Sequence, residues 1–363
     1  MKRRKKKAKK RFFLSFFVFI ILIGTLIFYV LDFSKGNSYE VQKTINTKKT
    51  DYKHTLINNN IIILENNELT IHMENETNRH TFSGDFSETM LNKVGNMIFV
   101  TDIKKQKTYI AELSGDICNE IYFPQEILSI KQDSRGGYIG FHVREKDGTE
   151  NLIFFDENGM ETGSIKGIKD GSIVDYSIDS LENTVAISII TYEKGIKSNI
   201  LFADIHGQVE SGKIFENEIF PAVFLVENGE LICVGDKRII KMNKKKETVW
   251  EKRIVADRAE YSFFKKGLVI CSSEIGKTNI ILLGKDNEII LSESVTGSIK
   301  GIESSKSKTI LYGDRSLYFV KNSSIEETKL TKDIVWAGLL SNGRVVIGSN
   351  NKIEILKDEN FIN

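Results

Sequence analysis

The sequence predicts an all-β protein, a β-propeller of about eight four-stranded blades, preceded by one N-terminal transmembrane α-helix. Three observations carry this prediction. A pair of short apolar runs recurs eight times from about residue 61 to the C-terminus, the repeats follow a nearly constant period, and a long uncharged stretch follows a strongly basic N-terminus.

The N-terminal segment has the composition of a membrane anchor. Residues 1–11 hold nine cations and no acid, and sixteen of the twenty residues in 12–31 are Phe, Leu, Ile or Val. At about 1.5 Å rise per residue, such a stretch spans roughly 30 Å, the thickness of the bilayer hydrocarbon. A cleavable signal peptide is the alternative, but its apolar core is usually shorter and ends at a small-x-small site, whereas this one runs on to Asp32 and Phe33. We expect a basic tail at 1–11 and an uncleaved helix at 12–32 in contact with lipid.

The distribution of cations sets the expected orientation. Nine cations precede the apolar stretch, and Lys35 is the only one in the eleven residues after it. The positive-inside rule keeps such a basic end in the cytoplasm, so the large C-terminal domain is expected outside a cell membrane crossed once. Without those nine cations the net charge falls from +2 to −7. A domain of that charge is not an obvious nucleic-acid binder.

Each repeat contains two apolar runs that have the β-branched and aromatic content of strands. The first runs are residues 61–64, 97–100, 138–141, 185–188, 231–234, 268–271, 309–312 and 345–348. The second runs are 69–73, 109–113, 151–155, 199–203, 238–242, 279–283, 316–320 and 352–356. The first runs begin 36 to 47 residues apart, the spacing of four-stranded propeller blades. We assign them to the second and third strands of each blade, which neighbouring blades cover on both faces.

Turn signals agree with that assignment. Asn-Gly at 228–229 and 342–343 falls between first and second strands, while Asn-Gly at 158–159 and His-Gly at 206–207 falls between third and fourth strands. The last repeat ends near residue 356 without a fourth strand. Because Tyr39, Val41 and Ile45 alternate with polar residues, we expect residues 39–48 to supply that strand and close the ring. The propeller is then 39–363, with 33–38 as a short tether; seven blades is the alternative count.

At this point the chain resembles quinoprotein-like and WD40-like propellers. More narrowly, it resembles uncharacterised single-pass membrane-anchored β-propeller proteins of low-GC Gram-positive bacteria, through its anchor and phrases such as Asn-Gly-Arg-Val-Val-Ile-Gly-Ser at 342–349. The resemblance implies membrane association and the propeller fold. Quinone-dependent propellers are similar in architecture but carry a Trp in nearly every blade, and here only Trp250 and Trp336 occur.

No catalytic, cofactor-binding or metal-binding constellation emerges from the sequence. There is no phosphate-binding Gly-rich loop ending in Lys-Ser/Thr and no Gly-x-Ser-x-Gly elbow. His72 and His80 fall in adjacent strands and are candidates to face each other, but a surface or strand-filling role is favoured over a metal site. The remaining histidines, His54, His142 and His206, are scattered. Paired acids at 156–157 and 326–327 are expected in solvated turns, and the lysine-rich run 241–246 in a solvated hairpin tip.

Three cysteines are too few for a disulfide framework, and Cys233 and Cys271 sit in apolar runs where free buried thiols are expected. We therefore expect a non-catalytic interaction or scaffold module of the cell envelope that binds a protein partner. A cell-wall carbohydrate-binding protein or glycan-active enzyme is the alternative. Clustering of Trp250, Trp336 and tyrosines at one mouth of the ring favours carbohydrate, and their dispersal into blades favours a protein partner.

Overall fold

The structure, a computed structural model, describes residues 40–48, 52–84, 86, 88–133, 136–192, 195–262, 266–306, 308–321 and 324–356. The expected tail, transmembrane helix and tether at 1–11, 12–32 and 33–38 lie outside these residues. Within the described ranges, no helix has the length and apolar character needed to cross a membrane.

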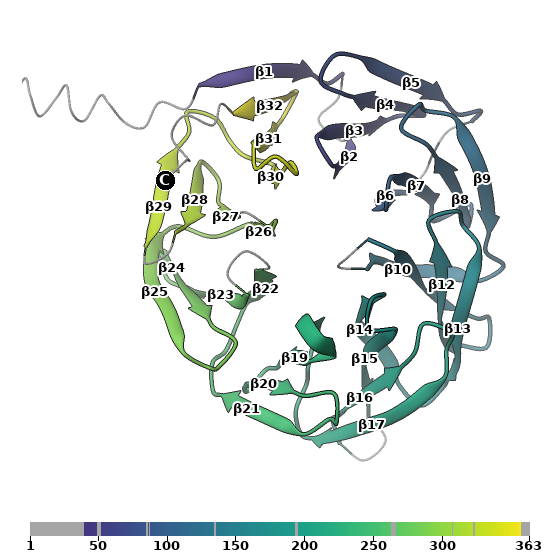
Figure 1. Cartoon of the computed structure of the whole chain (residues 1–363), viewed down its shortest axis with the longest axis vertical. Helices are drawn as coiled ribbons and strands as arrows, with labels where there is room; N and C mark the ends of the chain where they lie inside the picture. Colours follow the sequence, from purple (N-terminus) through teal and green to yellow (C-terminus); the bar gives the residue numbers. More distant parts are fainter. Residues whose placement is uncertain are drawn as a thin grey trace, which may run out of the picture.

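Eight four-stranded antiparallel sheets are arranged in a ring around a central axis (Figure 1). Blade 1 contains β2 (Lys53–Ile57), β3 (Asn60–Glu65), β4 (Glu68–His72) and β5 (Thr77–Thr81). Blade 2 contains β6 (Thr89–Val94), β7 (Met97–Asp102), β8 (Lys107–Ala111) and β9 (Ile117–Tyr122). Blade 3 contains β10 (Glu126–Gln132), β11 (Tyr138–Arg144), β12 (Glu150–Asp156) and β13 (Glu161–Ile168). Blade 4 contains β14 (Ser172–Asp179), β15 (Thr184–Thr191), β16 (Lys197–Ala203) and β17 (Val209–Glu216).

Blade 5 contains β18 (Ala222–Leu225), the 3₁₀ turn η1 (Glu227–Gly229), β19 (Leu231–Val234), β20 (Ile239–Met242) and β21 (Thr248–Lys252). Blade 6 contains β22 (Arg258–Ser262), β23 (Gly267–Glu274), β24 (Lys277–Leu283) and β25 (Ile289–Thr296). Blade 7 contains β26 (Gly301–Ser304), β27 (Thr309–Tyr312), β28 (Ser316–Val320) and β29 (Ile325–Lys329). Blade 8 contains β30 (Trp336–Leu339), β31 (Val345–Ser349), β32 (Lys352–Leu356) and β1 (Val41–Asn46).

The fold prediction is confirmed for the eight four-stranded blades. Every apolar pair read from the sequence falls on the second and third strands of a blade, so the count is eight rather than seven. These strands are buried almost throughout, as in β7 and β15. The fourth strands alternate between exposed and covered positions, because only their inner side packs. Mid-blade strands therefore read as continuous apolar runs and outer strands do not.

The ring is closed by strands from the two ends of the described chain. β1 pairs antiparallel with β32, with Val41 opposite Leu356 and Ile45 opposite Ile353. β1 lies within the 39–48 segment expected to close the ring. Closure pairs the outer edge of β32, which would otherwise be open.

The core consists of eight clusters of buried side chains, one between each pair of neighbouring blades. The cluster between blades 3 and 4, for example, includes Phe154, Tyr176 and Ile187. The cluster between blades 8 and 1 includes Ile45, Tyr52 and Trp336. Since each blade buries both faces against its neighbours, the hydrophobic effect stabilises the ring as a unit.

Antiparallel connections divide the loops between two faces. We call the turn face the one that carries the loops between first and second strands and between third and fourth strands of each blade. The crossover face carries the other loops within blades and the connections between blades. The expected turns at Gly159, Gly207, Gly229 and Gly343 all lie on the turn face, each with a positive φ. Val41 and Leu356 also lie at the turn-face end of blade 8.

Candidate functional site

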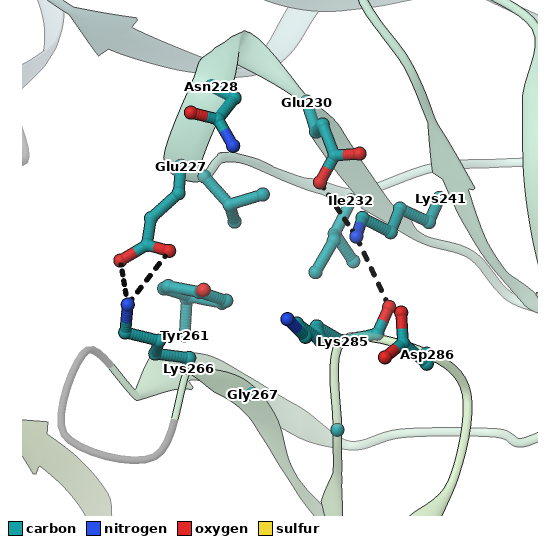
Figure 2. Close-up of a pocket in the computed structure, with 12 residues that line it drawn as sticks. Glu227, Asn228, Glu230, Ile232, Lys241, Tyr261, Lys266, Gly267, Lys285 and Asp286 are labelled. Carbon is teal, nitrogen blue, oxygen red and sulfur yellow. Dashed lines mark hydrogen bonds and ion pairs between the residues drawn. The ribbon is translucent and has the colours of Figure 1, made fainter.

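A polar groove lies on the turn face over blades 5 and 6. It consists of two adjoining pockets of about 220 Å³ and 330 Å³, which share Asn228 and Glu230. The loops after β18, β20, β22 and β24 form its walls. The residues of the first pocket that are labelled in Figure 2 are Glu227, Asn228, Glu230, Ile232, Lys241, Tyr261, Lys266, Gly267, Lys285 and Asp286. We refer to the two pockets together as the turn-face groove.

The tight turn between β18 and β19 shapes one wall of the groove. Asn228 has φ +62° and Gly229 has φ +65°, in the left-handed region that Gly and Asn tolerate best. The positive φ of Gly229, rather than a lack of space, favours glycine there, because the nearest obstacle to a Cβ is the flexible end of the Lys244 side chain at 2.9 Å. The Asn-Gly signal in the sequence thus positions Glu227 and Glu230 at the groove.

Lys241 on β20 is a buried cation at the floor of the groove, with 5% of its surface exposed. Its ammonium lies 2.7 Å from Oε2 of Glu230 and donates a hydrogen bond of 3.2 Å to the carbonyl oxygen of Lys285 (Figure 2). A lysine ammonium has three donors, and these two contacts occupy two of them. A buried charge is tolerated only with such partners, which fixes Lys241 against both blades.

The other charged side chains of the groove differ in how they are paired. Lys266 lies 3.0 Å from Glu227, and Lys244 lies 2.6 Å from Glu182 of blade 4. Lys285 and Asp286 are exposed, and neither side chain has an ion-pair partner among the described residues. Figure 2 shows the Lys285 amine directed into the space between Tyr261 and Lys241. Among the described residues, Lys285 and also Lys245 in the second pocket therefore offer the groove ammonium groups without an ion-pair partner.

The side chains of the groove are suited to binding polar or charged groups. Its side chains are ammonium groups, carboxylates, amides and the Tyr261 phenol. Within the described ranges, no cluster of His, Cys, Asp and Glu has the arrangement of a metal site. A polar surface of mixed charge with a buried cation recognises polar or charged groups through ion pairs and hydrogen bonds.

A second group of charged residues lies on the innermost strands. Burial raises the pKa of Glu260 on β22 to about 7, helped by the nearby charge of Glu303 on β26. Burial also raises the pKa of Glu303 to about 7, although this side chain keeps contact with water. Burial lowers the pKa of Lys93 on β6, against the opposing effect of Glu303. Because no described pocket encloses these groups, we assign them no ligand.

The lysine-rich run 241–246 departs from its expected role. The sequence predicts one solvated hairpin tip, yet Lys241 and Met242 are buried in β20 and only the following residues form the turn. Lys246 pairs with Glu210 at 3.2 Å and lies over the ring of Phe202. The β20 strand is short and buried on both faces, so the strand pattern continues into the run. A Lys in a buried strand gives no apolar signal, which is why sequence reasoning missed Lys241.

The tryptophans are dispersed rather than clustered. Trp336 is buried on β30, the innermost strand of blade 8, and its indole N–H donates to the Tyr52 hydroxyl at 3.0 Å. Trp250 lies on β21, the outermost strand of blade 5, and donates to the carbonyl oxygen of Lys285 at 2.9 Å. Both side chains contribute to interblade packing. No aromatic platform for a sugar ring is formed by these two residues.

His72 and His80, the candidates to face each other, do not do so. In the β4–β5 register His72 lies opposite Thr77 and His80 lies opposite Leu69, so the two rings sit at opposite ends of the pair. His142 instead contacts Glu150 at 3.0 Å in a buried network. Glu150 also accepts a hydrogen bond of 2.8 Å from the backbone N–H of Ile173, which ties blade 3 to blade 4.

The cysteines are placed as expected, but only one of the two acid pairs lies at a turn. Asp156 and Glu157 lie at the end of β12 and in the turn after it, whereas Glu326 and Glu327 lie within strand β29, so their expected place in a turn is wrong. Cys233 and Cys271 are buried free thiols, while Cys118 is free and exposed. Asp156 accepts hydrogen bonds from the backbone of Asn158 and Met160, so it shapes a turn. Glu326 pairs with Lys321, and Glu327 accepts from Ser316 at 2.7 Å. Local structural partners thus account for these groups.

The fold defines the chain as an eight-bladed β-propeller protein. Residues 33–357 match the family described as "Family of unknown function (DUF5711)". The match spans most of the chain, and the protein belongs to this family.

Solved structures share the architecture at low sequence identity. BamB from Moraxella catarrhalis superimposes with a TM-score of 0.60 at 9% identity, covering 90% of this chain and 99% of that chain. The Dos1 propeller gives 0.62 at 11% identity, covering 88% and 95%. A chain of the Mitotic Checkpoint Complex gives 0.50 at 9% identity, also covering 88% and 95%. At such identities these likenesses show the fold.

Two curated relatives match a part of the chain. They are the 5-dehydro-2-deoxygluconokinases of Clostridium botulinum strains Eklund 17B (Type B) and Alaska E43 (Type E3), each 24% identical over 203 residues. The match covers 54% of this chain, and the chain spans 57% of the length of these relatives.

Proposed function

We propose that this protein is a membrane-anchored, extracytoplasmic β-propeller that acts as a non-catalytic protein-interaction or scaffold module of the cell envelope. The basic tail at 1–11 and the apolar stretch 12–32 support single-pass anchoring with the N-terminus in the cytoplasm. The low cation content after the stretch, where Lys35 is the only cation before Lys43, supports an external propeller.

The observation that carries the interaction role is the closed ring of eight interblade cores. A ring closed by β1 and β32 holds the loops of its two faces in fixed positions, and rigid presentation lowers the entropic cost of binding a partner. BamB and a chain of the Mitotic Checkpoint Complex share this fold, and the second belongs to a protein complex, so the likeness supports a scaffold role by fold analogy.

A protein partner is favoured over carbohydrate because the side chains of Trp250 and Trp336 pack between blades. We do not propose for this chain the kinase activity for which the curated relatives are named. Their match is partial, and the sequence carries no phosphate-binding Gly-rich loop of the Lys-Ser/Thr type.

Topology is tested by labelling the native Cys118, which is exposed. Cys233 and Cys271 are buried and are not expected to react. In intact cells a membrane-impermeant maleimide is expected to label Cys118. A cysteine placed in the tail by Ala8→Cys, in a Cys118→Ser background, is expected to react only after permeabilisation. Labelling of both positions only after permeabilisation would contradict the external propeller.

The interaction role is tested by photo-crosslinking in intact cells. A photoreactive residue replaces Ser114 on the turn face or Ile275 on the crossover face of the full chain; both are exposed. We expect at least one of these two positions to give a discrete protein adduct. Further exposed positions on the same face should give the same adduct. The control position is Val269, which is fully buried. The scaffold proposal is wrong if Ser114 and Ile275 give no more adduct than the control position Val269 and the purified chain cleaves cell-wall glycan.

A further inference from the structure

The charges of the turn face are divided between its two halves. In blades 1–4 the described turn-face loops carry acids and no Lys or Arg; Arg135, in the same loops, lies outside the described residues. These acids are Glu74, Glu76, Glu112, Asp116, Asp133, Glu157, Glu182 and Asp204. In blades 5–8 the same loops are rich in cations. These are Lys244, Lys245, Lys246, Lys266, Lys285, Lys306, Lys308, Lys321 and Arg344.

The acids in the loops of blades 5–8 only partly offset these cations. They are Glu227, Glu230, Glu247, Asp286 and Glu288, and Glu227 is already paired with Lys266. Lys245, Lys285 and Lys306 are exposed and have no ion-pair partner among the described residues. We call the turn-face loops of blades 5–8 the basic half. The turn-face groove opens within it, and the crossover face shows no comparable division, since its loops mix both signs around the ring.

The chain enters the propeller at the same half of the same face. Val41, the first residue of β1, lies at the turn-face end of blade 8 opposite Leu356. Eight residues, 33–40, separate the apolar stretch from β1, and at 3.3–3.6 Å per residue they reach at most about 26–29 Å. If residues 12–32 cross the bilayer, the rim of blade 8 stays within that distance of the headgroups. The disc satisfies this limit whether it stands edge-on or lies face-on to the bilayer. The distribution of charge on the turn face therefore decides between the two orientations.

We infer that the basic half of the turn face rests on an anionic membrane surface, with lipid phosphate groups as the ligands of the unpaired lysines and of the turn-face groove. This inference rests on the proposed membrane anchoring and deepens it. A lysine ammonium binds phosphate as a point charge, and the Lys285 amine is already directed into the groove. The attraction acts over a Debye length, about 8 Å at physiological ionic strength, which requires the loops to be close to the lipid.

The turn-face loops of blades 1–4, which we call the acidic half, set the direction in which the disc tilts. These loops are repelled by the same anionic surface, so the disc tilts about blade 8 with blades 5–7 lowered and blades 1–4 raised. The crossover face and the acidic half then remain open to the protein partner.

The experiment uses the full chain in lipid nanodiscs made either of phosphatidylcholine alone or with about 30% phosphatidylglycerol. Cys118→Ser removes the exposed thiol, and single cysteines carry a fluorophore quenched by spin-labelled lipid. Three exposed serines give matched probe sites: Ser324 in the basic half, Ser114 in the acidic half, and Ser298 on the crossover face beside blade 7. We expect Ser324→Cys to be quenched at least twofold more than Ser298→Cys or Ser114→Cys with phosphatidylglycerol. That excess should fall in 0.5 M salt and in phosphatidylcholine alone.

Charge reversal at Lys245, Lys285 and Lys306 is expected to abolish the excess quenching at Ser324. The matched control reverses three exposed crossover-face lysines, Lys104, Lys146 and Lys237, and should leave it unchanged. If the chain remains in the bilayer, equal quenching at Ser324 and Ser298, or quenching that does not depend on phosphatidylglycerol, overturns the inference. Extraction of the chain by alkaline carbonate overturns the anchoring itself, so the two failures are distinguishable.

Discussion

The indole of Trp336 stacks on the imidazole of His54, with ring centroids 3.6 Å apart and planes 12° apart. Trp336 belongs to β30 of blade 8 and His54 to β2 of blade 1, so the stack spans the junction between the last and the first blade. The Tyr52 hydroxyl, which accepts from the Trp336 indole at 3.0 Å, precedes β2 by one residue. The junction where the ring closes thus has both an aromatic contact and a hydrogen bond.

Trp336→Ala is expected to destabilise the fold by about 3–5 kcal/mol, because it removes a buried aromatic side chain and leaves the Tyr52 hydroxyl without this donor. The measurement is urea unfolding of the full chain in detergent, followed by circular dichroism. Trp250→Ala is the matched control. Trp250 is only partly buried on an outermost strand, so its loss should cost clearly less. Equal costs would mean that the junction has no special role in stability.

His54 should make the protein sensitive to acid. Burial, and secondarily the charge of Lys53, lowers the pKa of His54 to about 4 from 6.5. Between these values the unfolded chain takes up a proton that the folded chain refuses, so stability falls as pH drops from about 6.5 to 4. One pKa unit corresponds to about 1.4 kcal/mol, so this residue accounts for up to about 3 kcal/mol.

His54→Phe keeps a ring against Trp336 and cannot titrate. Unfolding midpoints measured at pH 7 and pH 4.5 should therefore differ less in His54→Phe than in the unmodified chain. His206→Phe serves as the control, since His206 is exposed at a turn. A pH dependence unchanged by His54→Phe but removed by His206→Phe would contradict this assignment.

Much of the fold is legible in the sequence because each blade buries both faces of its middle strands. Runs such as Ile61 to Leu64 and Val185 to Ile187 are apolar throughout, and this feature locates the middle strands of every blade. The outer strands have one covered side and vary in composition, so their positions follow only from the turns before them. β1 is legible because Ile45 alternates with polar neighbours and because the last repeat lacks a fourth strand.

The candidate site is far less legible. The turn-face groove combines Glu230, Lys241 and Lys285, which come from three different loops and strands of two blades. No local pattern links residues so placed, and their pairing depends on how blade 5 packs on blade 6. The only local signal is the Asn-Gly turn at 228–229, which predicts a tight turn but no groove. Whether His72 and His80 face each other is likewise not legible, since the β4–β5 register is set by its turn and not by the histidines.

Glu260 should make the fold less stable at high pH, opposite in sign to His54. Burial first, and the charge of Glu303 second, raises its pKa to about 7 from 4.5. The folded state then holds the proton more tightly than the unfolded state, and the stability that this gives is lost as pH rises from about 4.5 through 7. Glu260→Gln should therefore raise stability at pH 8 by about 1–2 kcal/mol, a value reduced for the water that reaches this side chain.

At pH 4.5 the gain from Glu260→Gln should vanish, which distinguishes titration from a general effect of the amide. Urea midpoints at the two pH values give the comparison. Glu76→Gln, at an exposed position in a hairpin loop, is the control and should change neither midpoint. A gain that is the same at pH 8 and pH 4.5 would show that Glu260 is not the titrating group.

Ile45 tests the closure of the ring by β1. Its side chain is 7% exposed and packs between blades 8 and 1, and its backbone pairs with Ile353. Ile45→Ala should cost about 2–4 kcal/mol, because it deletes buried methyl groups in a packed interface. Val41→Ala on the same strand should cost well under 1 kcal/mol, since Val41 is 36% exposed. Both variants keep the backbone of β1 and differ only in what the side chain buries.

The second readout is limited proteolysis of the full chain. Weakening β1 uncovers β32, so Ile45→Ala should be cleaved near the ends of blade 8 several times faster than Val41→Ala, because local opening there requires less free energy. Cleavage elsewhere in the ring should change little at low protease. If Ile45→Ala and Val41→Ala unfold at the same urea concentration and are cleaved at the same rate, β1 adds nothing to ring stability. The fold would then be held by the seven blades that are continuous in sequence and by β30, β31 and β32 alone.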